Sequence, residues 1–207
     1  MRKIISLFKR NYETDWLVRD EVVEGAEWVL AGEGTPTRKF DGTCCMVRGG
    51  KLYKRYDVRK GRTAPPLFEP AQEPDATTGH WPGWIPVGEG PDDKWHREAF
   101  TGCQLDDGTY ELVGPKVQGN PENLSVHLLV KHGRDRLPDC PRTFHGIRNF
   151  LVNYQLPNGA GVEGIVWHHP DGRMVKIKTR DFGLERIPIS RSTLESVAPA
   201  VGRHKTL

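Results

Sequence analysis

The feature that most constrains the fold is a hairpin signal in the first quarter of the chain. Two runs of apolar and β-branched residues, Thr43–Arg48 and residues 51–56, flank the dipeptide Gly49-Gly50. Two consecutive glycines suit the positive φ angles of a two-residue turn between antiparallel strands. Residues 43–56 are therefore expected to form a hairpin within an antiparallel sheet. This hairpin is expected to hold Lys39 at the start of one strand and Arg55 towards the end of the other.

A second hairpin signal surrounds the turn Pro170-Asp171-Gly172. Loop length decides which side chains share a face, because a one-residue slip of register reverses every side chain. A two-residue loop would place Glu163 across from Lys178 and on the same face. A three-residue loop with a bulge at Gly172 would pair Glu163 with Thr179 and turn Lys176 and Lys178 away. The first register is the one that a site containing all three charges requires.

One segment has helical periodicity. Phe144, Ile147, Leu151 and Tyr154 recur at spacings of three and four residues, which predicts a helix over about 142–155. The remaining apolar runs are short and separated by turn residues, as in a sheet protein. We expect an α+β fold of antiparallel sheets with flanking helices. The chain is expected to be a single domain, 1–207, with an ordered proline-rich insertion at about 60–100.

Composition excludes few functions. The 207 residues carry a net charge of +3 and a mean hydropathy of −0.59, and no run of 18 apolar residues occurs. The basic residues near the start are followed by too short an apolar run for a signal peptide. We expect a cytoplasmic protein without a membrane partner. The mild positive charge permits a phosphate-rich partner but does not demand one.

The four cysteines do not form a recognisable framework. Cys44 and Cys45 are adjacent, Cys103 and Cys140 stand alone, and no Cys-x-x-Cys pair occurs. Adjacent cysteines suit neither a structural zinc site nor an easy disulfide. The cysteines are expected to be reduced.

The motif with the most chemical content is Lys39-Phe-Asp-Gly. On its own, a lysine followed by Asp41-Gly42 is most often a surface turn. Its companions change this interpretation, since Glu163 and the pair Lys176 and Lys178 follow downstream. A nucleophilic lysine, a carboxylate and two further lysines are the groups needed to form a bond to a nucleotide phosphate.

These motifs occur in an order that identifies a family. The chain resembles the covalent nucleotidyltransferases, namely ATP-dependent DNA and RNA ligases and messenger-RNA capping enzymes. It is most similar to the small RNA ligases related to the vertebrate 5′-to-3′ RNA ligase. The resemblance covers residues 35–184 and rests on Lys39-Phe-Asp-Gly-Thr-Cys-Cys, Pro82-Gly-Trp-Ile-Pro-Val, Glu111-Leu-Val-Gly, Gly119-Asn-Pro, Glu163-Gly-Ile-Val-Trp-His and Lys176-Ile-Lys.

The resemblance implies an ATP-grasp-like nucleotidyltransferase cleft. Only 29 residues follow Lys178, so the C-terminal OB domain of the DNA ligases and capping enzymes is not expected here. It also implies that Lys39 takes AMP from ATP, passes it to an RNA 5′-phosphate, and that a 3′-hydroxyl then seals the strand. The implied cofactors are ATP and Mg²⁺ or Mn²⁺, and the implied partner is RNA with 5′-phosphate and 3′-hydroxyl ends. It further implies catalytic roles for Lys39, Lys176 and Lys178, and metal binding by Glu163 and Glu111. The residues that it implies bind ATP or AMP are Lys39, Asp41, Gly42, Arg55, Glu111, Glu163, Lys176 and Lys178.

The physical chemistry of lysine agrees with this assignment. A lysine attacks phosphorus only as the neutral amine, and neighbouring cations such as Lys176, Lys178 and Arg55 disfavour its charged form. Glu163 and Glu111 offer the oxygen ligands that Mg²⁺ uses.

Other functions stay open at this stage. The site would also serve a nucleotidyltransferase acting on DNA ends or on GTP, and a decayed site would leave a non-catalytic RNA-end-binding module. Arg38 departs from the family pattern, in which an acidic residue is expected before the lysine. A monomer is presumed.

Overall fold

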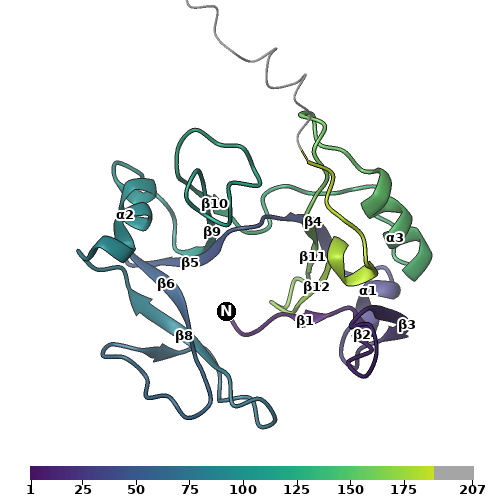
Figure 1. Ribbon diagram of the computed structural model, residues 1–207, viewed down its shortest axis with the longest axis horizontal. Helices are drawn as coiled ribbons and strands as arrows, with labels where there is room; N and C mark the ends of the chain where they lie inside the picture. Colours follow the sequence, from purple (N-terminus) through teal and green to yellow (C-terminus); the bar gives the residue numbers. More distant parts are fainter. Residues whose placement is uncertain (189–207) are drawn as a thin grey trace, which may run out of the picture.

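A computed structural model of the chain describes residues 1–188. Within these residues the fold is α+β, with two main sheets and a two-stranded ribbon (Figure 1). The six-stranded sheet is antiparallel throughout and has the order β10 (Leu128–Lys131), β9 (Gly108–Val113), β5 (Thr43–Arg48), β6 (Lys51–Val58), β8 (Trp81–Pro86), β7 (Glu69–Pro70).

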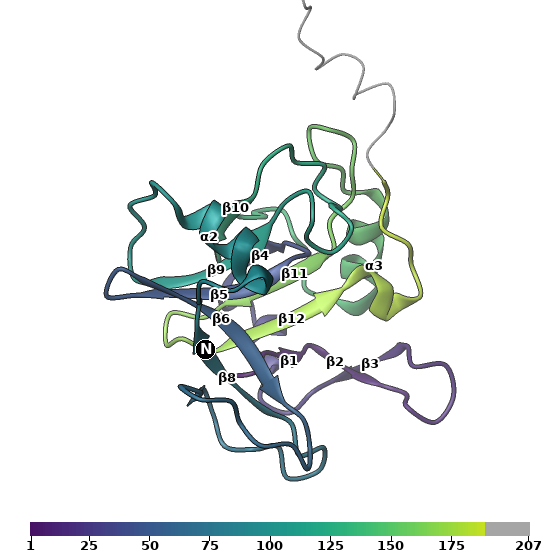
Figure 2. The same ribbon diagram turned by 60° about the vertical axis from the view of Figure 1, so that its left-hand side comes forward.

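The four-stranded sheet has the order β1 (Ile5–Ser6), β12 (Met174–Lys178), β11 (Gly164–His168), β4 (Thr35–Lys39). Its pairs are antiparallel except for β1 and β12, which run parallel. The ribbon pairs β2 (Phe8–Arg10) with β3 (Val18–Val22), and it projects beside the four-stranded sheet (Figure 2). The expected antiparallel architecture is confirmed.

Each main sheet is backed by its own hydrophobic core. The four-stranded sheet packs Ile165, Trp167 and Ile177 against α1 (Glu27–Leu30) and α3 (Phe144–Asn153). The six-stranded sheet packs Tyr110 and Leu112 against α2 (Lys94–Phe100). Because side chains alternate along a strand, the intervening residues of both sheets face each other across the interior of the molecule.

Two predicted elements are confirmed closely. The β5–β6 hairpin closes through Gly49 and Gly50, whose φ angles are +56° and +71°, and Arg48 pairs with Lys51. Helix α3 lies inside the predicted range, and the Thr143 hydroxyl caps it by accepting a hydrogen bond from Gly146 N. The proline-rich residues 60–100 contain β7, β8, a 3₁₀ turn at Pro91–Asp93 and α2.

The position of Lys39 differs from expectation. It was expected to begin a strand of the 43–56 hairpin, but it is the last residue of β4 in the other sheet. Residues 40–42 then cross to the six-stranded sheet, where β5 begins at Thr43. Lys39 therefore lies where the chain passes from one sheet to the other.

The register of β11 and β12 also corrects the sequence prediction. Val166 pairs with Lys176 and Gly164 with Lys178, so the structure has the register of the three-residue loop. Thr179 N accordingly donates to Glu163 O at 2.8 Å. The prediction that this register would turn the lysines away was wrong, because Lys176 and Lys178 lie on the same face as Val166 and the neighbouring strand's Lys39.

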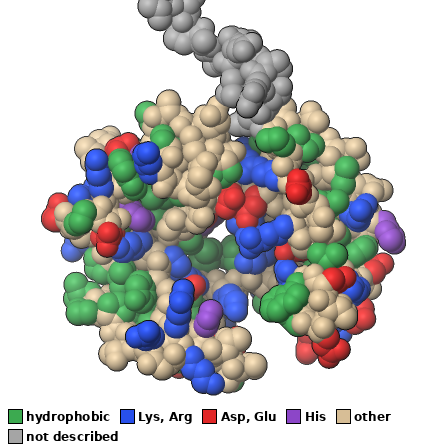
Figure 3. Space-filling model, in the orientation of Figure 1, with side chains coloured by type: hydrophobic (Ala, Val, Ile, Leu, Met, Phe, Trp, Pro, Cys, Tyr) green, Lys and Arg blue, Asp and Glu red, His purple; other side chains and the backbone are tan. Residues whose placement is uncertain are grey.

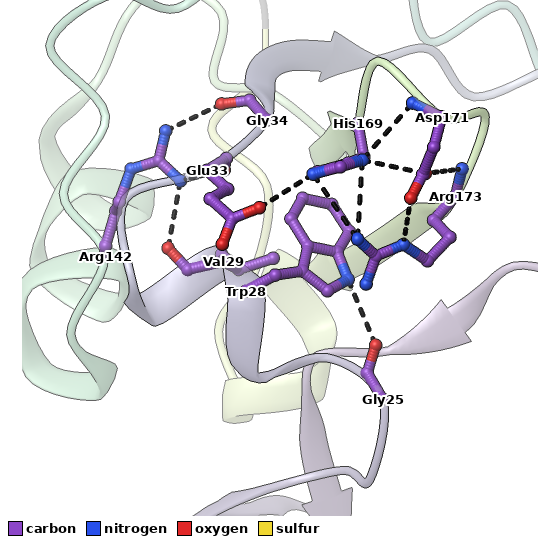
Figure 4. Close-up of polar contacts among 9 residues, drawn as sticks. All are labelled: Gly25, Trp28, Val29, Glu33, Gly34, Arg142, His169, Asp171 and Arg173. Carbon is purple, nitrogen blue, oxygen red and sulfur yellow. Dashed lines mark hydrogen bonds and ion pairs between the residues drawn. The ribbon is translucent and has the colours of Figure 1, made fainter.

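The turn that sets this register is held by polar contacts (Figure 4). His169 Nδ1 lies 2.7 Å from Asp171 Oδ1, and Arg173 Nε donates to Asp171 Oδ2 at 2.7 Å. Glu33, just beyond α1, lies 2.8 Å from His169 Nε2, and the Arg173 guanidinium stacks over Trp28. Gly172 has a φ of +91°, as a bulge at this position needs. The turn is thus docked on the α1 region.

No helix among residues 1–188 is both long and apolar enough to cross a bilayer.

Candidate functional site

A cavity with a volume of about 350 Å³ lies between the facing surfaces of the two sheets. This is within the usual range of small-molecule sites. Figure 3 shows the molecule hollowed between its two halves, with acidic and basic side chains around the hollow. The predicted site residues that line the cavity are Lys39, Gly42, Arg55, Glu111 and Lys176.

A single carboxylate joins two of the predicted lysines. Glu163 Oε2 lies 2.6 Å from Lys39 Nζ, and Glu163 Oε1 lies 2.6 Å from Lys178 Nζ. All three side chains are less than one-fifth exposed. Lys39 Nζ also donates to Phe40 O at 3.1 Å. The structure therefore brings together the lysine, the carboxylate and one of the paired lysines, as the sequence predicted.

The carboxylates beside these lysines differ in acidity. Burial acts to raise the pKa of Glu163, but the charges and hydrogen bonds of Lys39 and Lys178 outweigh it and hold the pKa below the usual value. Asp41 has a raised pKa, first because it is partly buried and then because Glu163 repels its charge. Glu163 is thus a firmly ionised carboxylate and a weak base in this state.

The pKa of Lys176 differs from its ordinary value. Burial, followed by the charges of Lys178 and Lys39, lowers its pKa to about 8. Its side chain lines the cavity next to the bridged pair. A lysine with a lowered pKa takes up a proton readily when an anion enters the cavity, because the anion favours the charged ammonium.

The opposite wall carries Arg55 from β6. Its guanidinium stacks over the Trp84 ring at 5.2 Å from the centroid, and its Nη1 donates to Met1 O at 2.7 Å. Arg55 Nε lies 3.4 Å from the exposed carboxylate of Asp57. Arg55 is therefore oriented by an aromatic ring while its charge faces the cavity.

Glu111 belongs to a separate polar group on the same wall. Its Oε1 accepts from Gly42 N at 3.1 Å, and its Oε2 lies 2.9 Å from His132 Nε2. Glu111 and Glu163, the two residues expected to bind one metal, share no polar contact among residues 1–188. Glu111 faces away from its neighbours Tyr110 and Leu112, which are in the core, because side chains alternate along a strand.

Two glycines of the motifs have a steric role. A Cβ on Gly42 would lie 2.1 Å from Leu112 O, and a Cβ on Gly164 would lie 2.2 Å from Ile177 O. Neither glycine has a positive φ. The Asp-Gly of Lys39-Phe-Asp-Gly is therefore a point of close backbone approach and not a turn.

Sequence reasoning missed several residues of the site. One of them is His132, whose Nε2 lies 2.9 Å from Glu111 Oε2. Cys44 faces the cavity, opposite Glu111 in the β5–β9 register. Only strand pairing brings these residues together, so no local spacing could have indicated them. The alternation of Cys44 with the buried Cys45 was the available signal.

Arg38 has an identifiable partner. It forms a buried ion pair with Glu122, whose other oxygen lies 3.1 Å from Arg186 Nη2. Burial lowers the pKa of Arg38, and the charge of Glu122 opposes this effect. Glu122 thus links Arg38, next to Lys39 in β4, to Arg186 in the segment after β12. This role accounts for a basic residue at position 38.

The fold and the site define an α+β protein whose two sheets enclose a cavity with a lysine–carboxylate cluster. The sequence model of the RNA ligase 1 family matches residues 99–205, just over half of the chain. The chain belongs to the RNA ligase 1 family.

Curated relatives agree with this membership. RNA ligase 1 of Pongo abelii is 28% identical, and the match covers 72% of this chain and 67% of the relative. RNA ligase 1 of Mus musculus is 27% identical, with 72% and 66% covered. RNA ligase 1 of Danio rerio is 29% identical, with 72% and 67% covered. The chain thus matches about two thirds of the length of these relatives.

Proposed function

We propose that this protein is an ATP-dependent RNA ligase that works through a covalent lysyl-AMP on Lys39. The observation that carries the proposal is the bridged arrangement of Lys39, Glu163 and Lys178, with both Nζ–O distances at 2.6 Å. It lies at the edge of a cavity of ligand size in a member of the RNA ligase 1 family.

In the first step, Lys39 Nζ attacks the α-phosphorus of ATP. The N–P bond forms, and the bond from phosphorus to the bridging oxygen of pyrophosphate breaks with its electron pair leaving on pyrophosphate. The ammonium of Lys39 loses two protons to solvent over the step. Glu163 orients the amine and is too acidic to serve as an effective base. Lys176 and Lys178 stabilise the charge that develops on the phosphoryl oxygens.

The residues present fit a magnesium ion. Glu163 and Asp41 are two neighbouring carboxylates among lysines, and carboxylate oxygens together with substrate phosphates are the ligands that Mg²⁺ takes. When bound, the ion supplies charge neutralisation to the phosphates. Glu111 is better placed for a ligand hydroxyl such as that of ribose, because it faces the cavity away from Glu163 and is held by Gly42 N.

In the later steps, an oxygen of an RNA 5′-phosphate attacks the phosphorus of the adenylate and the N–P bond breaks, which returns the amine to Lys39. A 3′-hydroxyl then attacks the activated 5′-phosphate, a phosphodiester forms, and AMP leaves. Arg55 offers a guanidinium fork at the cavity for the incoming 5′-phosphate or the nucleotide sugar.

Intact mass after incubation with ATP and Mg²⁺ tests the proposal. Wild-type protein should gain the mass of one AMP, and Lys39→Ala and Lys39→Arg should not. Lys60→Ala, which changes an exposed lysine away from the cavity lining, is the matched control and should gain AMP. A gain of GMP mass with GTP, but no gain of AMP mass with ATP, would identify GTP as the nucleotide substrate.

The second candidate is an RNA-end-binding module without catalysis. Salt-dependent RNA binding by a folded protein that forms no adenylate with any divalent metal would favour it over the ligase. Sealing assays with DNA in place of RNA ends test the remaining alternative.

A further inference from the structure

A trio of different ligand types lies on the cavity wall opposite the lysine cluster. Cys44 Sγ, a carboxylate oxygen of Glu111 and a ring nitrogen of His132 all lie within 4.8 Å of one another. Within residues 1–188 this is the one group of three cysteine, histidine and acidic side chains with such spacing. All three residues line the cavity.

The backbone explains why these side chains meet. Strands β5 and β9 are neighbours, and their register pairs Cys44 directly with Glu111. His132 follows β10, the other neighbour of β9, and its N–H donates to Thr109 O at 3.0 Å. The three ligands thus come from two adjacent strands and from the residue that follows a third, and a sheet holds them more firmly than long loops would.

Two of the side chains are already oriented by their other polar atoms. His132 Nδ1 lies 2.9 Å from the Thr109 hydroxyl, which leaves Nε2 directed at Glu111. Glu111 Oε1 is held by Gly42 N, which leaves Oε2 facing the histidine. Contacts of this kind fix the tautomer and the ring orientation of histidines that bind metals.

The ligand types select the class of cation. One sulfur, one imidazole nitrogen and one carboxylate oxygen form a set that Zn²⁺ and related thiophilic ions accept, whereas Mg²⁺ takes oxygen ligands. Three protein ligands leave one position of a tetrahedral zinc site open. Since the trio lines the cavity, that position opens into it.

Cys44 is poorly suited to act as a free nucleophile. Burial, and then the charge of Glu111, raises the pKa of its thiol to about 12. A divalent cation supplies the positive charge that would stabilise a thiolate here. On binding, the S–H bond breaks, the proton passes to solvent, and the sulfur–metal bond forms.

We propose that Cys44, Glu111 and His132 form a binding site for a thiophilic divalent cation of the Zn²⁺ class, with its open position facing the cavity. A second consequence rests on the proposed function. Zn²⁺ bound here engages Glu111, which is assigned above to the nucleotide, and so inhibits formation of lysyl-AMP.

Cadmium titration tests the site directly, because a Cd²⁺–thiolate bond has an ultraviolet charge-transfer band. Wild-type protein should develop the band with one equivalent of Cd²⁺. Cys44→Ser and Cys44→Ala should both lack it, and Cys103→Ser, which changes an exposed cysteine elsewhere, should retain it. His132→Gln and Glu111→Gln should each weaken Zn²⁺ binding about 100-fold, and Thr109→Val about 10-fold.

Three results would overturn the proposal. The first is absence of the band in the wild type, and the second is its persistence in both Cys44 variants. The third is a band that depends on Cys44 but is indifferent to His132→Gln and Glu111→Gln. Melting curves without metal confirm that each variant is folded. This readout needs no ATP, so it stands or fails separately from the ligase activity. Inhibition of AMP incorporation by Zn²⁺ in wild type but not in Cys44→Ser checks the second consequence.

Discussion

Glu163 and Lys178 are joined by a 2.6 Å ion pair although they are not paired across the β11–β12 ladder. Lys178 pairs with Gly164, and Glu163 lies just before β11 begins. The strict alternation of strand side chains therefore does not govern Glu163. Gly164 has no side chain to separate the carboxylate from the lysine, and its backbone approaches β12 closely.

The first prediction concerns this pair. Glu163→Gln leaves the charges of Lys39 and Lys178 without their shared carboxylate, so the variant should be less stable to unfolding. Removing one lysine as well, with Lys178→Met, should relieve part of the repulsion. We expect a coupling free energy of about 1–3 kcal/mol in a double-mutant cycle measured by denaturant unfolding.

The exposed pair Lys9 and Glu21 provides the control cycle for this measurement. Its coupling should stay below about 1 kcal/mol, as for other surface pairs. Additive effects of Glu163→Gln and Lys178→Met would mean a coupling free energy of zero, and would contradict the prediction that the ion pair stabilises the fold.

The second prediction concerns pH. The pKa of Lys176 is about 8, so the side chain is an ammonium below that pH and a neutral amine above it. Affinity for an ATP analogue with a methylene between the α- and β-phosphorus should fall as pH rises above about 8. The decrease should approach about tenfold per pH unit. Calorimetric titration between pH 7 and 9.5 measures it.

Lys176→Arg serves as the matched variant, because a guanidinium stays charged across this range. Its affinity for the analogue should be nearly independent of pH. An equal slope in the wild type and in Lys176→Arg would assign the titration to another group.

The third prediction concerns two glycines at points of close backbone approach, Gly42 and Gly164. Gly42→Ala and Gly164→Ala would each push a Cβ to within about 2.2 Å of a backbone oxygen, so the strands beside Lys39 must shift. A displacement of about 1 Å at a reacting group costs about 100-fold in rate. Single-turnover formation of lysyl-AMP should slow accordingly. Gly90→Ala, where a Cβ meets open space and φ is −64°, should react at the wild-type rate.

The fourth prediction concerns the buried carboxylate of Glu122. Glu122→Gln removes the carboxylate that Arg38 and Arg186 share, while their guanidinium groups stay largely buried. The free energy of unfolding should fall by about 3–5 kcal/mol. The exposed Glu21→Gln should change it by less than about 0.5 kcal/mol. A similar small loss in both variants would mean that water reaches Glu122.

The sequence predicted the residues of the lysine cluster better than it predicted the geometry that assembles them. Lys39, Glu163 and Lys178 were found from their motifs, since each motif carries its own chemistry. The β11–β12 register was wrong because the argument extended strand alternation to Glu163, which lies outside the strand. The prediction that Lys39 begins a strand of the 43–56 hairpin was also wrong. An Asp-Gly step resembles a turn in sequence, whereas Gly42 is here because the backbone of another strand lies too close for a Cβ.

The group of Cys44, Glu111 and His132 shows a different limit. These residues are separated by 67 and 21 positions in the chain. Only the order of strands β5, β9 and β10 makes them neighbours. Sheet order depends on long-range packing that a single sequence does not display, whereas the Gly49-Gly50 hairpin is a local structure and was predicted correctly.

The two hydrophobic cores lie behind different sheets, and Lys39 ends the strand from which the chain crosses between them. Each half therefore has its own core, so one half can unfold before the other in the free protein. A nucleotide attached to Lys39 and reaching Arg55 or Glu111 would contact both halves at once. Its stabilisation would then be shared, so adenylylation would act as a thermodynamic coupler that makes the two halves melt together.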